Sequence, residues 1–145
     1  MEKLPHLYTV SVSASPEENL SVDADGLPTL AVAAPKQFGG PGDQWSPEEL
    51  LMAAVANCLV LSFRAIASAS SFSWLDIECH CDGVLDKVER KMQFTKITNR
   101  VKLTIGSLDD VGRAEKLLHK AEETCLVSNS LSTKTEIECE VVVAG

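Results

Sequence analysis

The sequence lacks the features that mark membrane, exported and nucleic-acid-binding proteins. Its longest unbroken apolar run covers residues 50–56, far short of the ~20 residues that a membrane-spanning helix needs. The N-terminus does not show the charged and then apolar pattern of a signal peptide. Lys and Arg number 13 against 21 Asp and Glu, for a net charge of -8, whereas phosphate binding requires clustered cations. We therefore expect a soluble, cytoplasmic protein with no nucleic acid and no membrane as partner.

Repeats, low-complexity tracts and interdomain linkers are also absent, so the sequence predicts a single domain over residues 1–145. A paired cysteine framework is missing too, because the chain has an odd number of cysteines, five. In a cytoplasmic protein such residues are more often buried, catalytic or metal-binding than permanently cross-linked. The five are Cys58, Cys79, Cys81, Cys125 and Cys139.

The sequence does contain the alternating hydrophobic patterns of an α+β protein. Patterns of period two predict strands, and longer apolar stripes predict two helices. The predicted strands cover residues 7–13, 20–24, 27–33, 74–81, 91–105 and 134–143; the first helix covers 47–69, and the second begins at Asp109 or Asp110 and ends near Cys125. Strands, a long helix, two strands, a helix and a final strand form an α+β order.

The start of the first helix is marked by several agreeing signals. Ser46 suits the N-cap, Pro47 the first helical position, and Glu49 completes a capping box. The helix that follows is apolar nearly all round, so it is expected to be buried on most sides. Cys58 falls in its middle.

Cys58 and Cys125 stand apart from the cysteines on predicted strands. A thiol peroxidase needs one cysteine held as a thiolate and a second that captures the resulting sulfenic acid. The first helix offers Cys58 an apolar pocket but no obvious hydrogen-bond donor, so a donor must come from elsewhere. The plainer alternative is that a cysteine on an apolar helix fills the core.

Two segments of the chain, each containing one of these cysteines, resemble known sequence motifs. The first is residues 46–58, with Pro47-Glu48-Glu49-Leu50 ten residues before Cys58, and the second is residues 125–131, Cys-Leu-Val-Ser-Asn-Ser-Leu. The first resembles the helix-start motif of the OsmC/Ohr family, and the second is similar to that family's Cys-Pro-(Val/Ile)-Ser-Asn-(Ala/Ser)-(Leu/Ile). The two cysteines stand 67 residues apart in the order expected for this family, whose members reduce organic hydroperoxides.

The resemblance implies an OsmC-like fold, an intertwined homodimer and no metal or organic cofactor. It makes Cys58 the peroxidatic cysteine, Cys125 the resolving cysteine and Glu48 the carboxylate that orients an arginine. It also implies a dithiol reductant such as a lipoylated protein. Ten helical residues rise ~15 Å, so Glu48 would reach a Cys58 only across a dimer interface or around a break. Alternatively, Glu48 is an acidic residue favoured by the helix dipole.

The sequence departs from the family pattern in its cations. No arginine precedes Arg64, and Lys36 is the best substitute by position, although a lysine cannot form the guanidinium's fork of hydrogen bonds. Leu126 stands where proline is common. Phe38 and Trp45 are expected to wall the substrate entrance or to cover the core.

Other readings of the same residues stay open. Cys79-His80-Cys81 could offer soft metal ligands, but on a strand His80 faces away from the two cysteines, so no metal site is expected. The chain could also be a redox-sensing or ligand-binding module that turns over little peroxide because it lacks the arginine. A purely structural dimer with inert cysteines is the remaining alternative.

Overall fold

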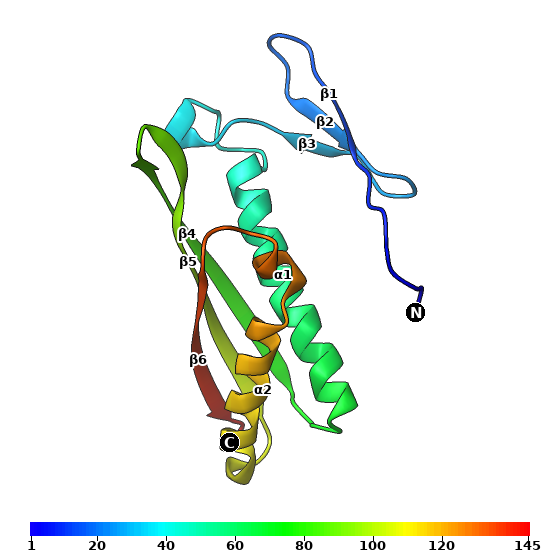
Figure 1. Cartoon of the computed structure of the whole chain (residues 1–145), viewed down its shortest axis with the longest axis vertical. Helices are drawn as coiled ribbons and strands as arrows, with labels where there is room; N and C mark the ends of the chain where they lie inside the picture. The colour runs from blue at the N-terminus through cyan, green and yellow to red at the C-terminus, as the bar shows by residue number, and fades with distance from the viewer. The chain divides into compact units, whose positions relative to one another are not determined.

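The computed structural model describes residues 1–145, which fall into two compact units, Met1–Leu50 and Leu51–Gly145. Figure 1 traces the chain through both, and each unit is described here by itself. The single domain expected over residues 1–145 stays a prediction. The α+β class is confirmed, because the chain contains two three-stranded sheets together with helices.

The first unit is a small antiparallel sheet in the order β1-β2-β3. The strands are β1 (Ser11–Ser13), β2 (Leu20–Asp23) and β3 (Leu30–Val32). The predicted turn between the second and third is present, with Gly26 at φ 75°, a conformation that glycine adopts without steric cost. β1 is shorter than predicted because Ser11 already pairs with Asp23, the last residue of β2, so the preceding residues have no strand to pair with.

The second unit contains a longer sheet in the order β4-β5-β6. β4 (Asp76–Val88) and β5 (Lys91–Ile105) are antiparallel, and β6 (Thr135–Val143) pairs with β5 in parallel. β5 has the predicted bounds. β4 runs past the predicted residue 81 because it pairs with β5 along its whole length, as far as Val88 opposite Lys91.

Two helices cover one face of this sheet (Figure 1). They are α1 (Pro47–Ala69), which has the predicted bounds, and α2 (Val111–Glu123). The hydrophobic core lies between the helices and β5. Its buried members are Leu59, Phe63, Ala67, Phe72, Val101, Leu103, Ile105, Ala114, Leu118 and Ala121. Burying a large side chain of this kind contributes roughly 1.5–3 kcal/mol, so this cluster fixes how α1 lies on the sheet.

The N-terminus of α1 is capped by the predicted residues. The Ser46 hydroxyl accepts a hydrogen bond from the Glu49 N–H at 3.2 Å and donates to Glu49 Oε1 at 2.8 Å. The predicted aspartate cap of α2 is wrong in detail, because Asp110 makes no capping hydrogen bond through its side chain. Ser107 instead accepts from the Asp109 N–H at the start of a short 3-10 turn, η2 (Leu108–Asp110).

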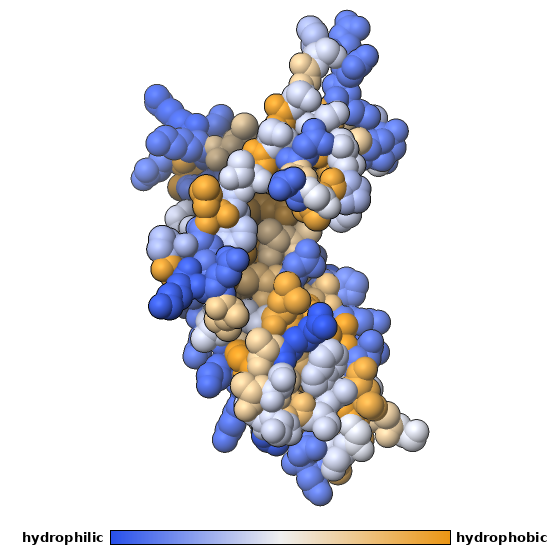
Figure 2. All heavy atoms as spheres, turned by 90° about the vertical axis from the view of Figure 1, so that its right-hand side faces the viewer, coloured by the Kyte–Doolittle hydropathy of each residue, from blue (hydrophilic) through white to orange (hydrophobic).

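Only one stripe of α1 is fully buried within the single chain. It comprises Val55, Leu59, Phe63 and Ala67, which recur every fourth residue. Leu61 is 57% exposed, and Figure 2, which faces the side where α1 lies, shows apolar atoms at the surface there. The apolar pattern therefore extends over more of the helix than one chain covers.

By length and composition α1 could also cross a membrane, although no membrane span was expected from the sequence. The sequence shows only a short unbroken apolar run because isolated polar residues such as Asn57 interrupt it without making the helix polar. One such helix is weak evidence, since core helices of soluble proteins pass the same test. Here the buried stripe of α1 packs in the core of the second unit.

Candidate active site

The structure brings Cys58 and Cys125 together, although they are far apart in the sequence. Cys58 lies in the middle of α1, and Cys125 is the N-cap residue of α3 (Leu126–Asn129), a short helix that the sequence patterns did not predict. The Leu126 and Val127 backbone of α3 reaches Cys58, so α3 lies beside α1; in Figure 1 α3 is the short orange helix drawn across α1. Cys125 is 1% exposed and Cys58 is half-buried, and both are free thiols.

Hydrogen bonds hold the pKa of Cys58 below its ordinary value. Burial by itself would raise this pKa, but donors around the sulfur outweigh it. The backbone N–H groups of Val127 and Leu126 point at the sulfur, and the Cys125 thiol and the Ser62 hydroxyl also favour the thiolate. Ser62 Oγ lies 4.0 Å from Cys58 Sγ. The environment of Cys58 thus suits a nucleophile, because the thiolate is the reactive form.

The pKa of Cys125 is shifted in the opposite direction. Burial raises it, and so does the neighbouring Cys58, while Ser128 offsets part of the rise. The Ser128 hydroxyl donates to Cys125 Sγ at 3.3 Å. Since the two thiols interact, their protons leave in two steps that belong to the pair. The first proton leaves Cys58, and Cys125 remains a thiol that donates to the Cys58 thiolate.

The sequence had left the donors to Cys58 unidentified. Ser62 lies one helical turn beyond Cys58 on the same face of α1, so its spacing could have identified it. The backbone groups of Leu126 and Val127 gave no such signal. Their N–H groups are free because the first turn of a helix has no intrahelical acceptor for them.

The other three cysteines are in surroundings that keep them protonated. Burial raises the pKa of Cys79 to about 11 and that of Cys81 to about 11, and burial also raises the pKa of Cys139. Cys79 Sγ lies 3.6 Å from Asn99 Oδ1. His80 is exposed on the opposite face of β4. No group of three or more His, Cys, Asp or Glu side chains is arranged to hold a metal ion.

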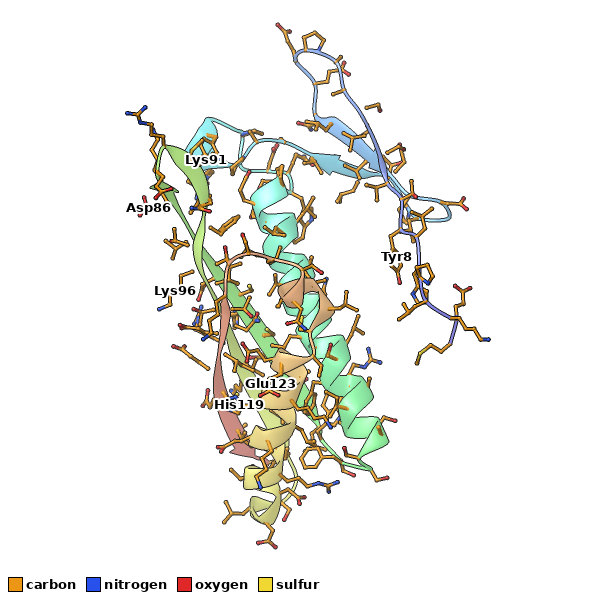
Figure 3. All side chains as sticks on the ribbon, viewed as in Figure 1. Tyr8, Asp86, Lys91, Lys96, His119 and Glu123 are labelled. Atoms are coloured by element: carbon orange, nitrogen blue, oxygen red, sulfur yellow. The ribbon has the colours of Figure 1, made fainter.

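The remaining predicted site residues belong to the first unit. Lys36 opens a 3-10 turn, η1 (Lys36–Phe38), and its aliphatic stem lies against Gly42. Phe38 is 52% exposed and Trp45 is 50% exposed. The second carboxylate oxygen of Glu48 is buried and has no hydrogen-bond partner. The roles of these residues stay predictions. Figure 3 shows the side chains of both units on the ribbon.

Comparison with known proteins identifies the family. The family model described as OsmC-like protein matches residues 40–140, and the chain therefore belongs to the OsmC-like family. An OsmC-like protein of unknown function from Vibrio cholerae shares the fold, with a TM-score of 0.87 at 21% identity over 94% of this chain and 100% of that one.

Two further relatives have names that refer to peroxides. The crystal structure of an organic hydroperoxide resistance protein OsmC from Legionella pneumophila is 30% identical, with a TM-score of 0.71 over 96% of this chain and 100% of that one. The peroxiredoxin OsmC of Escherichia coli is 26% identical over 96 residues, 66% of each chain. Family membership and these names support a peroxide-related role for the chain.

Proposed function

We propose that this protein is a thiol peroxidase that reduces organic hydroperoxides through a Cys58 sulfenic acid and a Cys58–Cys125 disulfide. The observation that carries the proposal is the pairing of two thiols with opposite pKa shifts. The pKa of Cys58 is lowered, partly by a hydrogen bond from Cys125, and the pKa of the buried Cys125 is raised, first by burial and also by Cys58. A peroxidatic and a resolving cysteine need this division of roles.

The proposed reaction has two chemical steps and a reset. The Cys58 thiolate attacks the distal oxygen of the hydroperoxide, the O–O bond breaks, and the alkoxide takes a proton from solvent and leaves as an alcohol. Cys125 then attacks the Cys58 sulfenic acid, which forms the disulfide and releases water. An external dithiol, such as a lipoylated protein, reduces the disulfide to the two thiols.

The apolar surroundings of Cys58 favour alkyl and lipid hydroperoxides over hydrogen peroxide. Val55, one turn before Cys58 on α1, and Leu59, the next residue after it, are fully buried apolar residues. Phe38 and Trp45 are proposed to line the entrance, and Lys36 to supply the positive charge that the family takes from arginine. Equal rates with cumene hydroperoxide and hydrogen peroxide would count against this preference.

The proposed assembly is a homodimer, and the proposed location is the cytoplasm. The exposed apolar side of α1 supports the dimer, since a second copy would remove this surface from water. Glu48, whose buried oxygen has no partner, would then act on the active site of the partner chain. Sedimentation as a monomer at micromolar concentration would contradict the dimer.

Peptide mapping after one equivalent of cumene hydroperoxide tests the proposed chemistry. We expect a rapid Cys58–Cys125 disulfide in the wild type. The Cys58→Ser variant should form none, and the Cys125→Ser variant should accumulate the Cys58 sulfenic acid, which dimedone traps. Free thiols at both positions in the wild type would refute the proposal.

A redox-sensing or ligand-binding module with little turnover is the second candidate. It is favoured by the lack of any arginine before Arg64 and by the unpartnered oxygen of Glu48. Turnover separates the two candidates: a peroxidase consumes many equivalents of hydroperoxide when a dithiol is supplied, whereas a sensor is oxidised once and then reacts no further.

A further inference from the structure

The resolving step poses a chemical problem in this structure. Cys125 is 1% exposed, and burial raises its pKa. A buried thiol is a poor nucleophile because only the thiolate attacks sulfur rapidly. Cys125 therefore needs a local group that stabilises the negative charge developing on its sulfur as it attacks Cys58.

Ser128 is the side chain placed to do this. Its hydroxyl donates a hydrogen bond to Cys125 Sγ at 3.3 Å, and Ser128 is itself only 8% exposed. The residue lies one turn after Cys125 in α3, so the helix holds the two groups in register. The Cys125 sulfur accepts the hydrogen bond from Ser128, and its own S–H can still donate to Cys58.

We infer that Ser128 is a positioning residue that activates Cys125 for attack on Cys58, an inference that rests on the proposed thiol chemistry. In the attack the Cys125 sulfur forms a bond to the Cys58 sulfur, and the S–O bond of the sulfenic acid breaks. The Cys125 proton goes to the departing hydroxide, which leaves as water. Cys125 is oxidised and the Cys58 sulfur is reduced, while the Ser128 hydroxyl stays bonded to the sulfur throughout.

Each thiol of the pair thus has a serine hydroxyl of its own. Ser62 stands 4.0 Å from Cys58, and Ser128 stands 3.3 Å from Cys125. The two hydroxyls should affect different steps: Ser62 the attack by Cys58, and Ser128 the attack by Cys125. A substitution at Ser128 that slows only the attack by Cys125 therefore acts on that thiol, whereas a substitution that disturbs folding would slow both attacks.

The aromatic disulfide DTNB tests the inference without a peroxide. Cys58 attacks DTNB and releases one thionitrobenzoate, and Cys125 then attacks the Cys58 mixed disulfide and releases a second. The second phase is identified as the one absent from Cys125→Ser. It should slow about tenfold in Ser128→Val, which removes one hydrogen bond to a charged sulfur, and its pH midpoint should move upward. Ser128→Thr, which has the shape of the valine variant but keeps the hydroxyl, should restore both the rate and the pH midpoint.

Two controls complete the experiment. Ser130→Ala removes a hydroxyl from the end of α3 that donates to the Leu126 carbonyl, and it should leave the second phase unchanged. An unchanged first phase in Ser128→Val shows that the site remains folded. The inference would be overturned if Ser128→Val and Ser128→Thr had the same second-phase rate, whether both were fast or both were slow. If the wild type completes both DTNB phases but reduces no hydroperoxide, the peroxidase proposal is refuted and the inference about Ser128 is not.

Discussion

Replacing Leu126 with proline should remove one hydrogen bond to the Cys58 thiolate and change little else. Leu126 is the first residue of α3, a position where proline is well tolerated. Cys125 before it is already extended, with φ -65° and ψ 108°, as the residue before a proline prefers. The Leu126 side chain is 70% exposed, so its loss costs little packing. The substitution therefore acts mainly through the backbone N–H.

The magnitude follows from the energy of one such bond. A hydrogen bond to a charged group contributes about 1.5–3 kcal/mol, and Leu126 makes the weakest of the hydrogen bonds that lower the pKa of Cys58. The ionisation equilibrium should therefore change by less than about tenfold. The expected result is a rise in the pKa of Cys58 and slower alkylation by iodoacetamide near neutral pH.

Rates of iodoacetamide alkylation measured across a pH series provide the assay. Leu126→Ala is the matched control, because it removes the exposed side chain and keeps the N–H. Alkylation of Leu126→Pro with the wild-type pH profile would refute the reasoning. So would an alanine variant that shifts as far as the proline variant, since the side chain would then be responsible.

Other predictions concern reactivity and stability. In a pH titration of the native protein, Cys58 should be alkylated at lower pH than Cys79 and Cys81, whose pKa values burial raises to about 11; simultaneous labelling would contradict these shifts. Because the folded state keeps protons on Cys79 and Cys81 that the unfolded state releases above the ordinary value of 9.0, the free energy of unfolding should fall as pH rises from about 9 to about 11. Urea denaturation at both ends of that pH range measures the fall, and an increase in the free energy of unfolding would contradict the predicted direction. Phe63→Ala should destabilise the protein by about 3–5 kcal/mol, because Phe63 is fully buried against Trp74 at 5.6 Å between ring centroids; a loss under about 1 kcal/mol would mean that this core is not formed. Ser46→Ala should cost about 1 kcal/mol through loss of the cap, and an unchanged denaturation midpoint would argue against the capping box.

The sequence was most informative where a pattern repeats over many residues. The bounds of α1 and β5 follow from their apolar periods and from the capping residues, and these are local properties of the chain. The short helix α3 was missed because four residues are too few to show a period. Much of the environment of Cys58 comes from that helix, so its donors could not be assigned from the sequence. Motif resemblance paired Cys58 with Cys125, and the contact between them depends on tertiary packing.

The parallel pairing of β5 with β6 also has a consequence for the order of folding. β4 and β5 form a hairpin between neighbouring segments, whereas β6 reaches β5 only after the chain has crossed through α2. Contacts between distant segments form slowly because a long loop must close first. Cys125 lies on this crossing segment, so we expect the two thiols to meet only when β6 docks. Pulse alkylation during refolding should show Cys125 becoming protected together with β6, and in that case the newly made chain would acquire its redox pair as one of the last events of folding.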